Sequence, residues 1–496
     1  MDSDFDYFPP SDLLQPDALL SQLAALVDTS TLAAHDFDVD NRTGFMPPQP
    51  PVARLPDEWN AWEVVLEEAS QGKLKLGTRD DLTDDEKAMS SRWRARVESL
   101  PILPIDNLGK SEVVIRRAHL VLSWILHFYI HTLPSSEPII IPRSLTLPLL
   151  RVSAQLQLPP VLTYGDTVLY NWAFKEPQAV PVPALDNLRS VQTFTGTRDE
   201  EEFYLTSARM ELRGVEALEL MRSTMDEAFV GDDIATKRIT TYLLRLSEVL
   251  SDLRTLLLAV REGCRPDVFY NEVRPWFKGI DSGDLERKWV FEGLLDTDDE
   301  TLEEPKELSG PSAGQSSLIH ALDIFLGVEE YSHSEQITGH EGTASTSTTT
   351  TTTTTLTPIP TSSTPMSSNP AKSAFLNRMQ TYMPRHHRNF LNHLRNNPRP
   401  LRNIVANGSN AALLEAYNKA VTSLTELRDA HIIIVTLYII IPARKATENV
   451  EKEKKEKGEE VKPLKGTGGT DLARFLKDVR NGTAGALFNS GSTDGL

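Results

Sequence analysis

The sequence comprises 496 residues with a formal net charge of −19, and 40% of its residues are hydrophobic. A nucleic-acid-binding protein needs a basic face to meet phosphate groups, so this charge argues against nucleic acid and against an anionic membrane surface as partners. The single cysteine, Cys264, rules out a disulfide framework and any metal site built from several cysteines. The length predicts more than one folding unit.

No signal peptide is expected, because the first residues, MDSDFDYFPPSDLL, are acidic and no apolar stretch follows them. The longest apolar runs are Ala118–Ile130 and Ile432–Pro442. Both are shorter than the roughly 18–20 residues that span a bilayer. We therefore expect them to be buried core segments of a soluble, cytoplasmic protein with no membrane partner.

In chain order, residues 1–54 are rich in Pro and Asp and are expected to form a partly ordered arm. A helical pattern runs from Leu55 to about Val97, and Ser111–Leu133 is a strongly apolar helix candidate. Leu147–Trp172 contains a further helix. The Pro-rich stretch Pro177–Asp186 is a candidate separator of two units.

A series of segments with apolar residues three and four apart follows this separator. They are Glu200–Ala228, Thr236–Gly263, Asp267–Lys278, Ser316–Gly327, Ser373–Arg395 and Ala411–Leu437. The sequence therefore predicts an all-α protein. Its doubtful segment is Ile432–Ile441, which β-propensity alone would make a strand; we expect a helix because no Gly or Pro interrupts the preceding pattern.

Two segments are too polar to pack. The Thr/Ser/Pro-rich stretch 342–372 cannot recover its ordering entropy and is expected to be disordered, and the charged stretch 447–465 is expected to be a flexible loop. The predicted organisation is then the arm, a small helical domain over 55–190 and a large helical domain over 191–496.

The stretch GPSAGQSS, residues 310–317, contains G-x-S-x-G, the pattern of the nucleophile elbow in many hydrolases. An elbow needs a buried strand before the serine, and the residues before Ser312 are acidic and poor in strand formers. The alternative is a loop of small residues that lets the backbone approach another group closely.

Histidines offer two candidate metal sites. His127 and His131 are four apart and could share a metal on one helix face, or could be ordinary core histidines. His431 stands where a polar helix becomes the most apolar stretch of the chain. It is either a satisfied core histidine or an axial ligand of a haem iron.

Two further motifs could bind a substrate. Arg274 lies among aromatic residues in VFYNEVRPWFKG, where a guanidinium could hold a carboxylate or lie over a surface aromatic cluster. The stretch KGTGGTDL, Lys465–Leu472, lacks the Walker pattern and is expected to be a mobile glycine-rich loop.

These segments together resemble the indoleamine 2,3-dioxygenases, in a fungal-type member that carries a Thr-rich insertion. The resemblance runs in family order from about Leu55 to Arg480. It is carried by RRAHLVLSWILHFYI, IPRSLTLPLLRVSAQLQLPPVLTYGDTVLYNW, FYLTSARMEL, VFYNEVRPWFKG, FEGL, SGPSAGQSS, RMQTYMPRHHRNFLNHL, LRDAHIIIVTLYIIIPA and KGTGGTDLARFLKDVR.

The resemblance implies an all-α protein with a smaller N-terminal and a larger C-terminal domain that holds one haem b. It implies an oxidoreductase that opens the indole ring of L-tryptophan with O₂ to give N-formylkynurenine, the first step of the kynurenine pathway, and a monomer. The alternative is a haem-binding relative with little turnover that acts as a sensor or carrier. A serine hydrolase using Ser312 is the third reading.

Residue by residue, the resemblance makes His431 the proximal iron ligand and Arg274 the group that receives the tryptophan carboxylate. Arg428 and Asp323 match a pair near the haem, although Asp323 could instead lie on a solvated face. The pocket that holds the indole is implied to include Phe269, Tyr164, Val168 and Phe203.

Ser207 matches a serine on the distal side of the haem, near O₂ and the substrate ammonium. Ser312 and Ala313 match a small-residue loop against haem and substrate, and Thr467 matches a loop that closes over the substrate. Two positions depart from the family. Pro311 replaces a common glycine and is expected to stiffen its loop. Thr167 replaces a familiar cysteine and is expected to make the pocket smaller and more polar.

Overall fold

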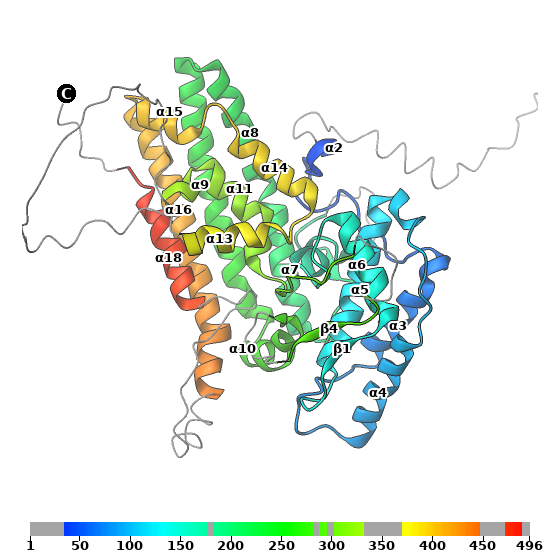
Figure 1. The fold of residues 1–496 in the computed structure, drawn as a ribbon. Helices are drawn as coiled ribbons and strands as arrows, with labels where there is room; N and C mark the ends of the chain where they lie inside the picture. Colours follow the sequence, from blue (N-terminus) through cyan, green and yellow to red (C-terminus); the bar gives the residue numbers. More distant parts are fainter. Residues whose placement is uncertain are drawn as a thin grey trace, which may run out of the picture.

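The structure is a computed structural model that describes residues 34–176, 183–280, 287–294, 302–331, 370–446 and 472–488. Helices dominate these residues, as the sequence predicts. Figure 1 shows a group of shorter helices on one side of the molecule and a bundle of longer helices on the other.

The first group is built from the N-terminal third of the described chain. Its main helices are α3 (Asn60–Gln71), α4 (Asp84–Glu98), α5 (Glu112–His131) and α6 (Arg143–Leu156). Helix α4 begins at Thr83, whose hydroxyl accepts from the Glu86 amide while the Glu86 side chain accepts from the Thr83 amide. This capping box satisfies two amide groups that the helix would otherwise leave without acceptors.

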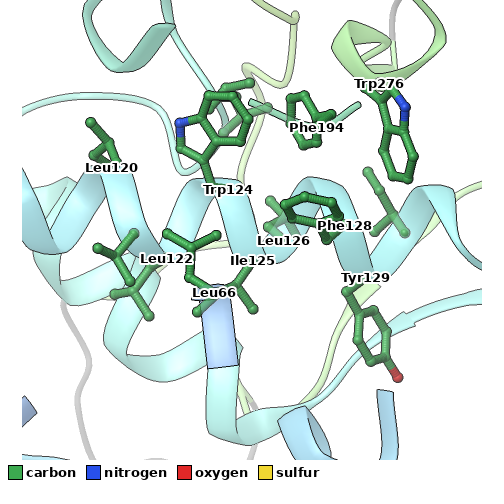
Figure 2. Close-up of a cluster of buried hydrophobic side chains, with 14 of the residues drawn as sticks. Leu66, Leu120, Leu122, Trp124, Ile125, Leu126, Phe128, Tyr129, Phe194 and Trp276 are labelled. Carbon is green, nitrogen blue, oxygen red and sulfur yellow. The ribbon is translucent and has the colours of Figure 1, made fainter. Parts of the chain in front are cut away.

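Helix α5 forms the centre of the largest hydrophobic core. Phe194 stacks between Trp124 and Trp276, with ring centroids 4.1 Å and 5.1 Å apart (Figure 2). By length and composition α5 could cross a membrane, yet 83% of its most apolar window is buried inside the protein. The apolar run Ala118–Ile130 is therefore a core segment, as predicted.

The second group is a bundle around two long helices, α9 (Asp233–Gly263) and α16 (Ala411–Val435), which pack along each other. The helices that surround this pair are α7 (Arg198–Arg213), α8 (Val215–Val230), α11 (Ser317–Phe325), α12 (Val328–Tyr331), α13 (Pro370–Gln380), α14 (Arg385–Arg395), α15 (Leu401–Asn407) and α18 (Leu472–Gly485). A second hydrophobic core fills the space between them.

Two predicted helices are each divided. The segment Glu200–Ala228 forms α7 and α8, which meet at Gly214, where a Cβ would lie 2.3 Å from a methyl group of Leu318. The segment Ser373–Arg395 forms α13 and α14, because Pro384 excludes the helical conformation for the residue before it.

Two other segments depart from a regular α-helix. Asp267–Lys278 forms only the short α10 (Pro266–Val268), then π- and 3₁₀-helical turns. The doubtful segment Ile432–Ile441 is helical, as predicted, and includes the π-helical η8 (Thr436–Ile440). The π-helix shows no signal in apolar spacing, because it shifts the hydrogen bonds by a single residue.

Strands are short in the described residues. β1 (Ile139–Ile141) pairs in parallel with β4 (Trp289–Phe291), and β2 (Trp172–Phe174) pairs antiparallel with β3 (Leu188–Ser190). Each has three residues, so they join loops to the helices without altering the all-α class.

Several predictions concern residues near or beyond the ends of the described segments. Within the expected N-terminal arm, Val39, Phe45 and Met46 are buried against the helices. Most of the Thr-rich stretch, the charged loop 447–465 and Thr467 lie outside the described residues. The division of the helices into two domains at residue 190 stays a prediction.

Candidate functional site

Three π-helical segments are linked by packing contacts that run through helix α7. They are η3 (Gly165–Leu169), η4 (Phe269–Val273) and η8. Helix α7 packs against the first two of them, and η4 contacts η8. Single π-helical turns occur often at functional sites, since they redirect side chains that a regular helix would place elsewhere.

An aromatic row links α7 to the helix that carries His431. Phe203 on α7 lies 4.4 Å from Phe269 in η4, and Phe269 lies 5.7 Å from Tyr438 in η8, measured between ring centroids. Tyr438 follows His431 by two helical turns and donates to the carbonyl of Cys264. Two of the predicted pocket residues, Phe203 and Phe269, are therefore in direct contact.

His431 lies within α16, and its imidazole makes no hydrogen bond or ion pair to the part of the chain that the structure describes. Although part of the residue is accessible, surrounding protein atoms lower the pKa of His431 to about 4, and the Arg428 guanidinium adds to the effect. The imidazole is therefore neutral at physiological pH and keeps a free nitrogen lone pair.

His127 and His131 differ, because each has a ring nitrogen close to a backbone acceptor. His127 Nδ1 lies 2.7 Å from the Trp276 carbonyl oxygen, and its Nε2 accepts from the Leu162 amide. His131 Nε2 lies 3.1 Å from the Lys278 carbonyl oxygen. The reading of His127 and His131 as core histidines, rather than as a metal pair, therefore fits the structure.

Ion pairs fix the helix of His431 to its neighbours. Arg428 donates to the Asp323 carboxylate on α11 and also to the Val479 carbonyl on α18. Arg480 on α18 donates to Asp429 over 2.8 Å. Asp323 is buried, so the alternative that it lies on a solvated face is wrong.

Arg274 begins the 3₁₀-helix η5 (Arg274–Phe277), directly after η4. The residue is buried, and its guanidinium carbon lies 5.6 Å from the centroid of the Tyr270 ring. This excludes a side chain that lies over the protein surface. Because η4 carries Phe269 and ends at Arg274, one segment brings an aromatic wall and a buried cation to the same region.

The small-residue loop 309–316 packs tightly against that segment. A Cβ on Gly310 would lie 1.7 Å from the Phe277 carbonyl oxygen, and one on Gly279 would lie 2.0 Å from the Leu308 carbonyl oxygen. Only glycine permits such an approach of two backbones. The close-approach reading of this loop is therefore confirmed.

Ser312 does not form a nucleophile elbow. The residues 302–311 before it form no strand, and its hydroxyl accepts from the Gly314 amide at the start of the 3₁₀-helix η7 (Ala313–Gln315). Ala313 is exposed. Ser312 and Ala313 thus occupy a turn that Gly310 anchors against η5.

Gln315, which the sequence did not single out, ties this loop to the pocket residues. Its Oε1 accepts from the Tyr164 amide over 2.8 Å, and its Nε2 donates to the Gly310 carbonyl over 2.9 Å. The signal that could have identified it is a long polar residue within a run of small ones.

Thr167 and Val168 are buried in η3, next to Tyr164. The Thr167 hydroxyl donates to the Thr163 carbonyl over 3.1 Å. The hydroxyl is thus taken up by the backbone, which reduces the extra polarity expected for the pocket.

Ser207 lies one helical turn after Phe203 on α7 and is half-buried. Four residues further on, the same helix carries Glu211, whose side chain was not identified from the sequence. Glu211 is buried and accepts hydrogen bonds from the Tyr164 and Ser316 hydroxyls. In the sequence, the feature that could have identified Glu211 is a single carboxylate four residues after Ser207.

The side chains around His431 suit a haem better than a bare metal ion. No group of three or more His, Cys, Asp or Glu side chains in the described residues could hold an ion. A haem needs only one axial nitrogen and an apolar surround. His431 provides the nitrogen, and Ile434, Val435 and Tyr438 provide buried apolar surface on the same helix and its π-helical end.

Two surface hollows, of about 280 and 210 Å³, have other linings. Leu150, Pro159 and Glu307 border the first, and Lys73, Thr197 and Trp276 border the second. His431, Ser207 and Arg274 line neither, so the candidate site rests on the convergence of side chains described above.

Comparison with known proteins gives one consistent result. The model of the family described as indoleamine 2,3-dioxygenase matches residues 33–486. The chain is 29% identical to indoleamine 2,3-dioxygenase 1 of Rattus norvegicus, covering 92% of this chain and 95% of that protein. It is 30% identical to indoleamine 2,3-dioxygenase of Saccharomyces cerevisiae, covering 89% and 90%. It is also 27% identical to 6-hydroxytryptophan 2,3-dioxygenase of Fusarium equiseti, covering 90% and 95%.

Proposed function

This chain belongs to the indoleamine 2,3-dioxygenase family, and on that premise we propose that His431, Arg274 and the residues around η3, η4 and α7 form its active site. The protein is a haem-dependent dioxygenase, an oxidoreductase that acts on tryptophan with O₂. The product is N-formylkynurenine, with both oxygen atoms of O₂ incorporated.

The observation that carries the assignment of the haem site is the imidazole of His431. It is neutral, lies among apolar residues and has no hydrogen-bond partner in the described chain. When bound, haem b supplies the iron that activates O₂ for cleavage of the indole C2–C3 bond. The protein's part is to hold the haem through His431 and to keep α16 in place through Arg428 and Asp323.

Substrate binding falls to residues on the other elements of the site. The guanidinium of Arg274 is a fixed donor that suits the tryptophan carboxylate. Phe203 and Phe269 hold the indole ring, and Val168 in η3 and Tyr164 directly before it close the pocket. None of these side chains is a conventional general base, so the protein contributes mainly orientation and the exclusion of water.

The remaining residues have supporting roles. Ser207 offers a hydroxyl to the substrate from α7, and the turn at Ser312 and Ala313 provides a wall that is thin enough for close approach. Thr467, outside the described residues, belongs to a loop that closes over bound tryptophan. The single thiol fits a reducing compartment such as the cytoplasm, where the protein acts as a monomer.

One experiment tests the function. The purified protein is reconstituted with haem, reduced, and examined by absorbance spectroscopy with and without L-tryptophan. It is then assayed with ascorbate and O₂, and N-formylkynurenine is detected by mass spectrometry. We expect a Soret band that shifts on addition of tryptophan, followed by product. A Soret band without product would instead support a haem sensor or carrier.

A further inference from the structure

Glu211 joins three elements of the candidate pocket through one oxygen atom. Its Oε1 accepts from the Tyr164 phenol over 2.9 Å and from the Ser316 hydroxyl over 2.7 Å. Tyr164 directly precedes η3, and Ser316 directly precedes α11. Glu211 thereby attaches α7, the helix of Phe203 and Ser207, to both.

The second oxygen of Glu211 lies in a different environment. Oε2 is buried and has no hydrogen-bond partner in the described chain. Burial raises the pKa of Glu211 to about 7, and the hydrogen bonds from Ser316 and Tyr164 oppose the rise. The titratable group that faces it is Tyr164, directly before η3, and the residue before α11 presents the Ser316 hydroxyl.

Hydrogen-bond directions follow from the number of protons. A phenol has one proton, and that of Tyr164 goes to Glu211. The Ser207 side chain also acts on Tyr164, where its hydroxyl opposes the rise of the phenol pKa. Glu211 and Ser207, four residues apart on α7, thus both act on the Tyr164 phenol.

We propose that Glu211 is a positioning residue of the tryptophan pocket, which fixes Tyr164 against Ser316. This inference rests on the proposed function, because it assigns Glu211 to the pocket that holds the substrate there. Glu211 itself need not touch tryptophan, haem or O₂.

The first test uses Glu211→Gln and Tyr164→Phe. Glutamine keeps the shape of the side chain, but its amide can donate to the phenol and so reverse the direction of both hydrogen bonds. We expect the KM for tryptophan to rise roughly three- to ten-fold, the equivalent of one lost hydrogen bond, with a smaller change in kcat. Tyr164→Phe removes only the hydroxyl, so it preserves the wall and gives a second variant if Glu211→Gln folds poorly.

A double-mutant cycle separates this role from general stabilisation. If Glu211 acts through Tyr164, adding Glu211→Gln to Tyr164→Phe should raise KM no further. Additive effects would overturn the proposal. The matched control is Glu200→Gln, because Glu200 is a buried carboxyl on the same helix that accepts from Tyr204 over 2.8 Å. This control should lower the melting temperature and leave the KM unchanged.

The pH profile supplies a readout that a merely structural role would not give. The raised pKa means that the neutral form of Glu211 is favoured in the folded state, and this advantage is lost as the pH rises through about 7. The ionised carboxylate accepts hydrogen bonds more strongly than the neutral acid, so we expect the wild-type KM to fall as the pH rises through about 7 and the KM of Glu211→Gln to lack this step. Identical profiles for the two proteins would refute the inference.

Failure of the two proposals can be told apart. If the wild-type protein binds haem and yields no N-formylkynurenine, the proposed function fails. If the wild type is active and Glu211→Gln matches it in KM and in pH profile, only the role of Glu211 fails. Binding of tryptophan to the ferric protein, measured by the shift of the Soret band, gives the same comparison without turnover.

Discussion

Arg428 on α16 forms a buried ion pair with Asp323 on α11, one helical turn before His431. Burial raises the pKa of Asp323, and Arg428 opposes that rise. We predict that Asp323→Asn lowers the free energy of unfolding by about 3 kcal/mol, because it leaves a buried guanidinium without its counter-charge. Chemical denaturation of the haem-free protein measures the loss.

The same variant should release haem faster, because α16 loses its bond to α11. Glu248→Gln is the control, since Glu248 forms an exposed ion pair with Arg245 on α9. It should change stability by less than about 1 kcal/mol. Equal haem dissociation rates for both variants would show that the Arg428–Asp323 pair does not hold the proximal helix.

Replacing His431 by alanine should abolish haem retention, because the described part of the chain offers no other imidazole that lacks a partner in this region. The measurement is the Soret absorbance after gel filtration. His131→Ala serves as the control: it removes a buried histidine that bonds to the Lys278 carbonyl, and it should keep its haem. Retention of haem by His431→Ala would contradict the proximal assignment.

Arg274→Ala should retain haem but bind tryptophan about 100-fold more weakly. This loss corresponds to about 3 kcal/mol, the contribution of a pair of charge-assisted hydrogen bonds. Arg274→Lys keeps the charge without the fork geometry, so it should recover only part of the affinity. The matched control is Arg261→Ala, an exposed arginine at the end of α9. Unchanged kinetics of Arg274→Ala would remove its carboxylate role.

His119 lies on α5 between two acceptors, with Nδ1 2.9 Å from Asp166 and Nε2 3.2 Å from the Pro159 carbonyl oxygen. Burial disfavours its charged form, but the Asp166 carboxylate and these hydrogen bonds raise the pKa of His119 overall. Its stabilisation is therefore complete below the unfolded pKa and is lost as the pH rises through the folded pKa.

The prediction is that the free energy of unfolding of the wild type, minus that of His119→Gln, decreases as the pH rises from below the usual pKa of histidine through the raised pKa of His119. Denaturation curves at several pH values measure this difference. Because Asp166 caps the turn that leads into η3, the variant should also weaken tryptophan binding. A difference that does not vary with pH would mean that His119 has the same pKa in the folded and in the unfolded protein.

Gly310→Ala should destabilise the protein by about 3 kcal/mol, because its Cβ would collide with the backbone carbonyl of Phe277. The turn that carries Ser312 must then move away from η5, so the KM for tryptophan should rise. Gly485→Ala is the control, because a Cβ at Gly485 meets nothing within 4 Å. Thermal melts and tryptophan titrations of the two variants test the tight packing of the loop.

The sequence by itself determined the helical class and the main candidates for chemistry. Apolar spacing marked α5 and α16, because burial of one helix face leaves a local, periodic record in the sequence. The apolar run after His431 is part of that record. The spacing did not reveal the π-helical turns at Phe269 and Tyr438, since a shift of one residue barely alters the pattern.

Only the tertiary structure decided how the site is held together. The hydrogen bond between Tyr164 and Glu211 joins residues 47 positions apart, and that between Ser316 and Glu211 joins residues 105 positions apart. Such pairs depend on how helices pack, and they leave no local periodicity to detect. His431 illustrates both sides: its helix was predictable, but only the tertiary structure showed that its imidazole has no hydrogen-bond partner among the described residues.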